Sequence, residues 1–315
     1  MNQATLDCKA LLTHSINHIL VFCFITVMSC VACDAHAAEL VNIAENTTRP
    51  SATAPDKVIQ SIVALSPHSV EMLYEIGLGD KIVATVDYAD FPESAKSIKR
   101  IGHSDLIDME ALLLINPDLV VLSFEDTSQP LIEQLKKLNL PMFDTSVNKL
   151  DDIADRLEEL GIATGNVSQG RQKAQAFNDT LSQLRQRYSA KSTVKVFYQI
   201  WPEPLTTVSG GWMNGLLSDC GATNVFANGV AAYPQVSMEQ VLVRMPELIL
   251  KPHYHGNSNQ ESINWTQWHE IPAVSHQQIK LIKGDLVHRT GPRVLQGMAK
   301  VCELVDAVRL QRAAL

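Results

Sequence analysis

The strongest constraint on the fold is a pattern that occurs twice, once in each half of the chain. One copy runs from Met109 to Leu122 and the other from Met238 to Leu250. Each copy opens with Met-Glu and a short apolar stretch, and a proline follows the glutamate by seven residues. An acidic residue and an apolar run come next. Because this order is typical of a helix, a proline stop and a buried strand, the repeat predicts two similar lobes.

The residues around the repeat indicate the fold class. Asp108 and Ser237 stand immediately before the two Met-Glu pairs, where helix N-caps are expected. Short apolar runs alternate with amphipathic stretches through the rest of both halves. Such alternation favours parallel strands covered by helices. We therefore expect an α/β protein with two mostly parallel-sheet lobes.

A single long helix is expected between the lobes. Residues 166–190 place apolar side chains at steps of three, four and seven, with polar residues on the other faces and Gly170 as a weak point near the start. Roughly 22 residues at about 1.5 Å each span about 33 Å. This helix predicts a rigid connector between an N-terminal lobe over 57–165 and a C-terminal lobe over 191–315.

The front of the chain resembles an export signal. Residues 1–37 contain an apolar run too short for a comfortable membrane span, followed by a small-x-small cleavage pattern at 35–37. Cys30 and Cys33 stand where a lipoprotein would be acylated, so the mature protein is expected to be either lipid-anchored or soluble in the periplasm. Residues 38–56 are polar and rich in Thr, Asn and Pro, which favours a flexible tether. We expect an exported protein.

Two cysteines remain in the predicted folded part, Cys220 and Cys302. An even pair in an exported protein favours one disulfide, which would tie the helix before Gly221 to the C-terminal helix. The alternative is a pair of buried free thiols.

Charge and motifs argue against several functional classes. The net charge is −8 and no run of Lys or Arg occurs, which argues against a nucleic-acid partner. The sequence contains no Gly-x-Ser-x-Gly elbow, no phosphate-binding loop and no His-Glu-x-x-His pair. No nucleophile and base are paired by spacing. We therefore expect a binding protein rather than an enzyme, with no cofactor.

Aromatic and histidine side chains gather in the loops that follow the predicted strands. Ligands of open α/β sheets lie beyond the carboxyl ends of the strands. An aromatic-lined cleft with few fixed charges suits a large, flat, partly apolar ligand. The side chains at these positions are Tyr88, Phe91, His103, Phe124, Trp201, Trp212, Tyr233, His253, Tyr254, His255, His288 and Arg289.

A different class of function rests on two of these histidines. His253 and His255 occupy alternate positions, which project to the same side of an extended segment and could bind a metal. A metal-dependent hydrolase would need a third ligand such as His288. A solvated loop is the competing interpretation.

Two glutamates occupy equivalent places in the repeat. Glu110 and Glu239 each lie in the first turn of a predicted helix, where the helix dipole stabilises a carboxylate. Their symmetric placement also predicts a contact with a two-fold partner that bears basic residues. Both interpretations stay open.

Several of these segments together resemble the periplasmic cobalamin-binding proteins of bacterial ABC importers. The similarity covers about residues 57–310 in order, and its most specific part is the run Tyr-Pro-Gln-Val-Ser-x-Glu-Gln-Val-Leu. The segments that carry it are Ile62–Pro67, Asp87–Pro92, Leu112–Val121, Tyr233–Leu242 and His288–Arg293.

The resemblance implies a monomeric protein with two α/β lobes joined by one long helix, of the class III binding-protein type. A corrinoid would be held between the lobes as a transported ligand. The matching positions that line the cleft in the family are Tyr88, Phe124, Trp201, Tyr233 and Arg289. His103 and His255 are added as ligand-binding candidates because this chain is unusually rich in histidine there.

The family also implies roles outside the cleft. Glu110 and Glu239 match paired glutamates that engage arginines of the membrane permease, and Cys220 and Cys302 match a disulfide. This chain departs from the family at Ser104, where the best-known member has a tryptophan. The departure leaves haem or a ferric siderophore as the alternative ligand.

Overall fold

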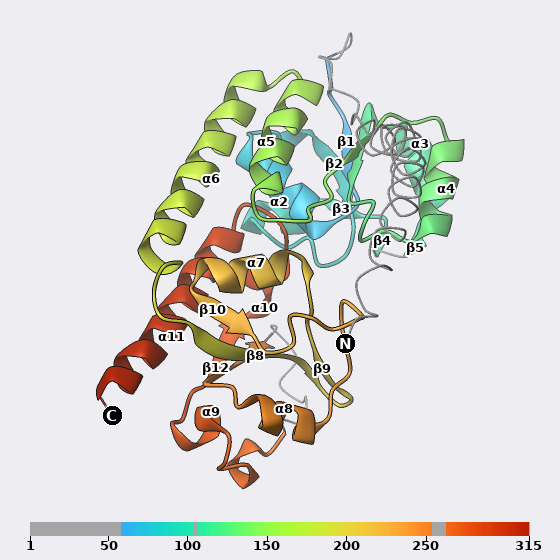
Figure 1. The fold of residues 1–315 in the computed structure, drawn as a ribbon. Helices are drawn as coiled ribbons and strands as arrows, with labels where there is room; N and C mark the ends of the chain where they lie inside the picture. Colours follow the sequence, from blue (N-terminus) through green and yellow to red (C-terminus); the bar gives the residue numbers. More distant parts are fainter. Residues whose placement is uncertain (1–57, 104–105, 254–262, 315) are drawn as a thin grey trace, which may run out of the picture. The chain divides into compact units, whose positions relative to one another are not determined.

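Two sheets organise the part of the chain that the computed structural model describes, residues 58–103, 106–253 and 263–314 (Figure 1). The N-terminal sheet contains, in spatial order, β3 (Lys99–Arg100), β2 (Ile82–Thr85), β1 (Ile62–Ala64), β6 (Leu119–Leu122) and β7 (Met142–Asp144). The C-terminal sheet contains β10 (Ala222–Asn224), β8 (Val194–Pro202), β11 (Leu248–His253) and β12 (Ile279–Lys283). Every pairing within these two orders is parallel, as predicted.

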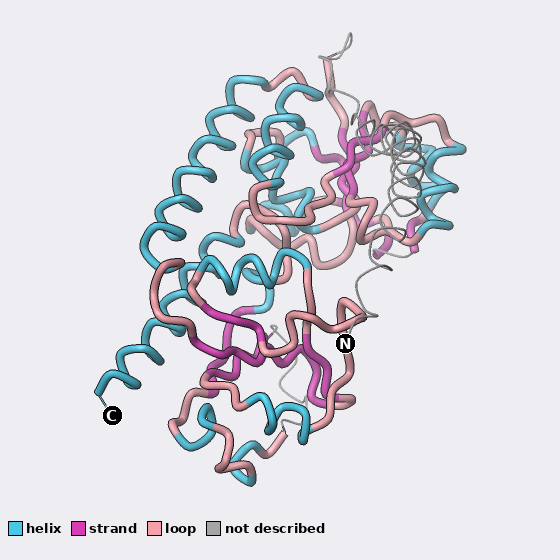
Figure 2. Tube along the Cα trace, viewed as in Figure 1, coloured by secondary structure: helices cyan, strands magenta, loops and turns pink. Residues whose placement is uncertain are grey.

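Helices flank the strands in both lobes (Figure 2). Those of the N-terminal lobe are α2 (Pro67–Glu75), α3 (Met109–Ile115), α4 (Gln129–Lys137) and α5 (Asp152–Ala163). Those of the C-terminal lobe are α7 (Gly211–Asp219), α8 (Met238–Arg244), α9 (Pro272–Ser275), α10 (Gly284–Val287) and α11 (Val294–Ala314). Short 3₁₀ helices are η1 (Gly79–Lys81), η2 (Glu93–Ser97) and η3 (Trp265–Gln267), and a small antiparallel ribbon joins β4 (Gly102–His103) to β5 (Leu106–Ile107).

The strands are buried on both faces because successive side chains point to opposite sides. In β1, Ile62 and Ala64 pack with α2 and α5, whereas Val63 faces α3 and α4. The C-terminal sheet follows the same rule. Val196 of β8 joins the cluster that contains α7 and α11, whereas Phe197 joins the cluster under α8 and α9.

The repeated pattern has the same local structure in both lobes. The Asp108 side chain caps α3 and the Ser237 side chain caps α8, as predicted. Both helices end in a left-handed residue directly before the proline. The acidic residue after the proline then accepts backbone hydrogen bonds from the segment at the start of its lobe. Asp118 accepts from Ser61 N at 3.0 Å, and Glu247 accepts from Lys195 N at 2.9 Å.

The long connector is α6 (Val167–Tyr188), and its close packing against α5 explains Gly170. A Cβ at Gly170 would lie 2.9 Å from the Gly161 Cα and 2.8 Å from the Leu157 carbonyl oxygen. Only glycine permits this approach. The residue that is a weak point by helix propensity is therefore the point of contact between the two helices.

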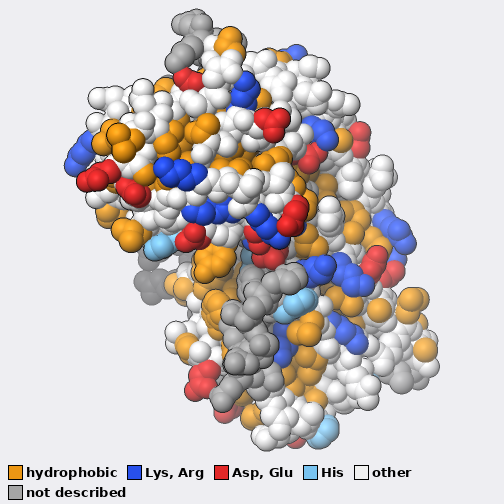
Figure 3. Space-filling model, turned by 180° about the vertical axis from the view of Figure 1, so that it is seen from behind, with side chains coloured by type: hydrophobic (Ala, Val, Ile, Leu, Met, Phe, Trp, Pro, Cys, Tyr) orange, Lys and Arg blue, Asp and Glu red, His pale blue; other side chains and the backbone are white. Residues whose placement is uncertain are grey.

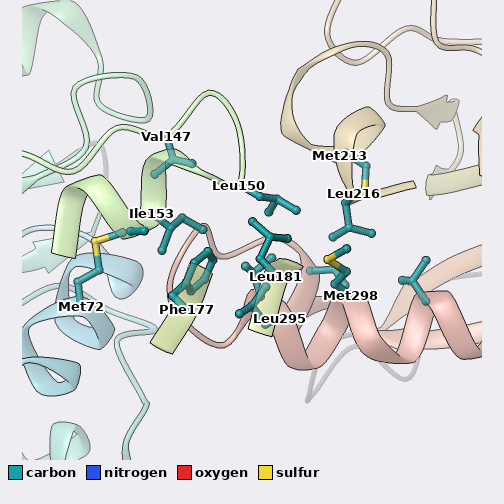
Figure 4. Close-up of a cluster of buried hydrophobic side chains, with 14 of the residues drawn as sticks. Met72, Val147, Leu150, Ile153, Phe177, Leu181, Met213, Leu216, Leu295 and Met298 are labelled. Carbon is teal, nitrogen blue, oxygen red and sulfur yellow. The ribbon is translucent and has the colours of Figure 1, made fainter. Parts of the chain in front are cut away.

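One hydrophobic cluster runs through both lobes. Figure 4 shows Met72 and Ile153 of the N-terminal lobe, Phe177 and Leu181 of α6, and Met298 of α11 in a continuous group of buried side chains. Because α6 and α11 both contribute to it, the lobes share buried apolar surface as well as a covalent link. Shared core of this kind limits large relative motion of the lobes.

The predicted disulfide is present. Cys220, which caps the C-terminal end of α7, bonds to Cys302 of α11 and closes a separation of 82 residues. Both residues are fully buried.

Two details of the C-terminal sheet go beyond the simple alternation of strands and helices. The strand β10 ends at Asn224, because the Asn224 side chain turns the chain. Its Oδ1 accepts from Phe226 N at 3.0 Å, and its Nδ2 donates to Val208 O at 2.7 Å. The antiparallel strand β9 (Leu205–Thr207), which pairs with β8, was not expected.

The expected signal (1–37) and the expected tether (38–56) lie outside the described residues. Within the described ranges, no helix combines the length and apolar character that a membrane crossing requires.

Candidate ligand-binding site

A cavity of about 410 Å³ lies between the two lobes. The N-terminal lobe supplies Glu125 and Asp126, which follow β6, and Val147, which precedes α5. The C-terminal lobe supplies the remaining walls. These are Ile200, Trp201, Val208, Ser209, Gly210, Gly211, Trp212, Met213, Ala232, Tyr233, His288 and Thr290. Much of the lining follows or ends a parallel strand, where the fold class places ligands.

Aromatic rings form much of the apolar wall. Trp201 is 43% exposed and Tyr233 is 67% exposed, so both rings are accessible to a ligand. Trp212 lies in the first turn of α7, lines the cavity and is half-buried. The loop that carries Tyr233 is held against β9, since Thr207 N donates to Pro234 O at 3.1 Å and Ser209 N donates to Ala232 O at 2.8 Å.

A fixed turn presents two carboxylates to the cavity. The Ser123 hydroxyl donates to Asp126 Oδ2 at 2.8 Å, and Glu125 N donates to the Ser146 hydroxyl at 3.0 Å. Partial burial and the neighbouring charges of Asp126, Asp144 and Asp152 raise the pKa of the Glu125 carboxyl. Burial and the neighbouring charges of Asp126 and Glu125 also raise the pKa of the Tyr233 phenol. This side of the cavity is negative.

His288 is a lining residue supplied by the C-terminal lobe. Its Nε2 is 2.7 Å from the hydroxyl of Tyr198, a fully buried residue of β8. Burial, partly offset by the charge of Asp285, lowers the pKa of His288 to about 4. The ring is therefore neutral at neutral pH and adds no positive charge to the cavity.

Arg289, the next residue, is used in ion pairs that join the lobes. Its guanidinium lies 2.7 Å from Asp90, 3.3 Å from Asp285 and 3.4 Å from Glu71. Although burial opposes the effect, the hydrogen bond and charge of Arg289 lower the pKa of the Asp90 carboxyl. The same guanidinium donates to the Tyr88 carbonyl oxygen at 3.1 Å. The side chain is only 13% exposed.

The structure brings some of the expected site residues together and places others nearby. Trp201 and Tyr233 line the cavity. Tyr88 and Arg289 contact each other beside the segment that supplies His288 and Thr290. Phe124 packs on the core next to the two lining carboxylates, and His103 is exposed on the β4–β5 ribbon. His255 lies outside the described residues.

Several lining residues were not singled out from the sequence. Trp212 and His288 were recognised only as members of the group of loop residues. Glu125 and Asp126 carry a signal that could have been used, because only Ser123 and Phe124 separate them from the apolar run 119–122. Ser209 and Thr290 carry none, since small polar residues are common in every loop.

The metal interpretation gains no support from the described part of the chain. There, no three side chains of His, Cys, Asp or Glu are grouped as metal ligands would be. His253 ends β11 and is exposed, whereas the third ligand considered, His288, contacts Tyr198.

The two symmetric glutamates are exposed on equivalent helices. Glu110 lies in the first turn of α3 and Glu239 in the first turn of α8. Each has an exposed aliphatic residue one turn later, Leu114 at 87% and Val243 at 79% exposure. On the face shown in Figure 3, acidic and basic side chains are interspersed among hydrophobic ones, without a broad basic surface in its described part.

Comparison with known proteins identifies the family to which the chain belongs. Residues 62–286 match the family model described as periplasmic binding protein. The vitamin B12-binding protein of Vibrio parahaemolyticus is 32% identical over 264 residues, which cover 83% of this chain and 95% of that protein. The vitamin B12-binding protein of Yersinia pestis is 30% identical over 257 residues, 81% of this chain and 90% of that protein.

Solved structures give the same result. The periplasmic vitamin B12 binding protein BtuF of Vibrio cholerae superposes with a TM-score of 0.74 at 32% identity, covering 80% of this chain and 98% of that one. The periplasmic heme-binding protein RhuT from Roseiflexus has a TM-score of 0.67 at 19% identity over 79% and 99% of the two chains, a likeness of fold alone. The chain belongs to the periplasmic binding protein family.

Proposed function

We propose that the protein captures cobalamin, or a related corrinoid, in the cavity between its lobes and delivers it to an ABC importer. The observation that carries this proposal is the combination of an inter-lobe aromatic cavity with relatives, named for vitamin B12 binding, that match along nearly their whole length. Binding proteins of this family hold a solute and release it unchanged. No catalytic step is needed.

The aromatic walls support a flat macrocyclic ligand. Trp201 and Tyr233 are exposed at the cavity, so stacking on a corrin ring would bury apolar surface that now faces water. Tyr88, 78% exposed, would extend this surface, and Phe124 is a further ligand-binding candidate. Arg289 would act mainly by holding the Tyr88 backbone, because its charge is already paired. His103 and His255 stay ligand-binding candidates.

Calorimetric titration of the mature chain with cyanocobalamin, haemin and a ferric siderophore tests this proposal. We expect one-to-one binding of cyanocobalamin and weaker or no binding of the other two. Haemin and siderophores are the alternative ligands, since carriers of both share the fold. Uptake of haemin or siderophore without cyanocobalamin would overturn the substrate and leave the family intact.

The partner surface is proposed on α3 and α8. Two exposed carboxylates at equivalent places, each one turn from an exposed aliphatic side chain, suit a two-fold permease with basic residues. The protein itself would act as a monomer in the periplasm, after export through 1–37. Acylation at Cys30 or Cys33 would anchor it to the membrane.

Charge reversal tests this surface separately from ligand binding. Glu110→Arg combined with Glu239→Arg should abolish cobalamin import by cells while the affinity of the purified protein for cyanocobalamin stays unchanged. Glu133→Arg combined with Glu303→Arg, at exposed positions on other helices, is the matched control. Normal import by the Glu110 and Glu239 variant, or a loss of ligand affinity, would contradict the assignment.

A further inference from the structure

The cavity is acidic on one side and, among its described lining residues, contains no Lys or Arg. Glu125 and Asp126 are both exposed at its edge, and neither forms an ion pair with a described basic side chain. The Ser123 hydroxyl holds the Asp126 carboxylate and the Ser146 hydroxyl holds the Glu125 backbone, so the turn keeps both residues at the cavity.

The two arginines that lie within three residues of the lining residues His288 and Thr290 are already neutralised. Arg289 is paired with Asp90, Asp285 and Glu71. Arg293 is paired with Glu71, and its guanidinium lies 3.6 Å from the centre of the Phe91 ring. An anionic group that entered the cavity would therefore meet two carboxylates and no available cation from these arginines.

This arrangement distinguishes ligands by the chemistry of their side groups. Haem carries free propionates, and many ferric siderophore complexes are anionic. The peripheral groups of cobalamin are mainly amides, whose N–H groups donate to carboxylates, and aquocobalamin is a cation. A carboxylate placed near Glu125 and Asp126 would be repelled, whereas an amide or a cation would be attracted.

We propose that Glu125 and Asp126 act as a charge filter that favours cationic and neutral amide-bearing corrinoids over ligands with free carboxylates. This inference rests on the proposed function and concerns selectivity within it. Because both carboxylates are exposed, solvent weakens the effect, and we expect roughly three- to tenfold differences in affinity.

The experiment compares three corrinoids that differ in charge: aquocobalamin, cyanocobalamin, and a cyanocobalamin derivative with one peripheral amide hydrolysed to a carboxylate. Dissociation constants are measured for the wild type, for Glu125→Gln combined with Asp126→Asn, and for Glu133→Gln as a control on an exposed face of α4. The wild type and the control should bind aquocobalamin most tightly and the carboxylate derivative most weakly.

In the double variant this spread between the three corrinoids should shrink to within about twofold. Exchange of the cobalt-bound water for a histidine would also favour aquocobalamin, but that preference would survive in the double variant. Equal affinities in the wild type, or a spread that the double variant retains, would overturn the filter and leave cobalamin binding standing. Failure of all three corrinoids to bind would overturn the proposed function itself.

Discussion

Replacing Glu71 by Gln should destabilise the protein far more than the same change one turn later in the same helix. Glu71 lies in α2 of the N-terminal lobe, and its side chain is 2% exposed. It accepts two hydrogen bonds from Arg293, one of them at 2.9 Å, and lies 3.4 Å from Arg289. Both arginines belong to the segment that enters α11 of the C-terminal lobe. This buried group therefore joins the lobes beside the cavity.

The loss of stability in Glu71→Gln depends on how much positive charge on Arg289 and Arg293 is left without a partner. Breaking a buried ion pair by removing one partner typically costs about 3–5 kcal/mol. Arg289 keeps Asp90 and Asp285, and Arg293 is 16% exposed and stacked on Phe91, so part of the positive charge stays compensated. We therefore expect about 3 kcal/mol for Glu71→Gln. In a domain of this size that corresponds to a fall in Tm on the order of 6–10 °C.

Urea unfolding followed by tryptophan fluorescence measures this difference. Glu75→Gln is the matched control, because Glu75 pairs with Lys173 at 2.8 Å with both side chains more than a third exposed. The control should lose at most about 1 kcal/mol. A Glu71 variant as stable as the Glu75 variant would refute the view that this buried group fastens the lobes together.

Three further predictions concern α6, the disulfide and His288. Gly170→Ala should lower the free energy of unfolding by roughly 1–3 kcal/mol, although alanine is the better helix former, because its Cβ would lie 2.9 Å from the Gly161 Cα; a stabilised variant in thermal unfolding would contradict the close packing. Cys220→Ser with Cys302→Ser should cost up to about 4.5 kcal/mol, the loop-entropy value for a separation of 82 residues; an unchanged urea midpoint would exclude that contribution. Because the pKa of His288 falls to about 4 on folding, the unfolded chain binds more protons between about pH 6.5 and 4. Stability should therefore decline across that window as the pH falls, by up to about 3 kcal/mol, and His288→Gln should flatten the decline in pH-dependent unfolding.

Local pattern predicted most of the fold. The two Met-Glu helices are α3 and α8, at the expected residues and with the expected caps, because capping and proline stops depend on neighbours in sequence. β10 ends at Asn224 although the apolar residues Val225 and Phe226 follow, since the Asn224 side chain bonds to the backbone of Val208 and Phe226 and turns the chain. An apolar run does not reveal such a turn.

The position of the inter-lobe cavity was easier to predict from the sequence than the chemistry of its walls. The rule that ligands lie beyond strand ends located the cavity, and Trp201 and Tyr233 line it. The ion pairs of Arg289 could not be predicted from the sequence, because its partners Glu71 and Asp90 lie 218 and 199 residues away along the chain. The negative wall formed by Glu125 and Asp126 was not predicted, because acidic residues are common in loops and these two belong to no specific motif.

Hydrogen exchange with and without cyanocobalamin tests most directly the claim that the ligand is held between the lobes. The account predicts slower exchange in cavity segments of both lobes, around 123–127 in the N-terminal lobe and around 200–213 and 286–291 in the C-terminal lobe. Exchange in α8 and α9, which lie on the far face of the C-terminal sheet, should be unchanged. Slower exchange confined to one lobe, or no change at a saturating concentration of cyanocobalamin, would contradict the account.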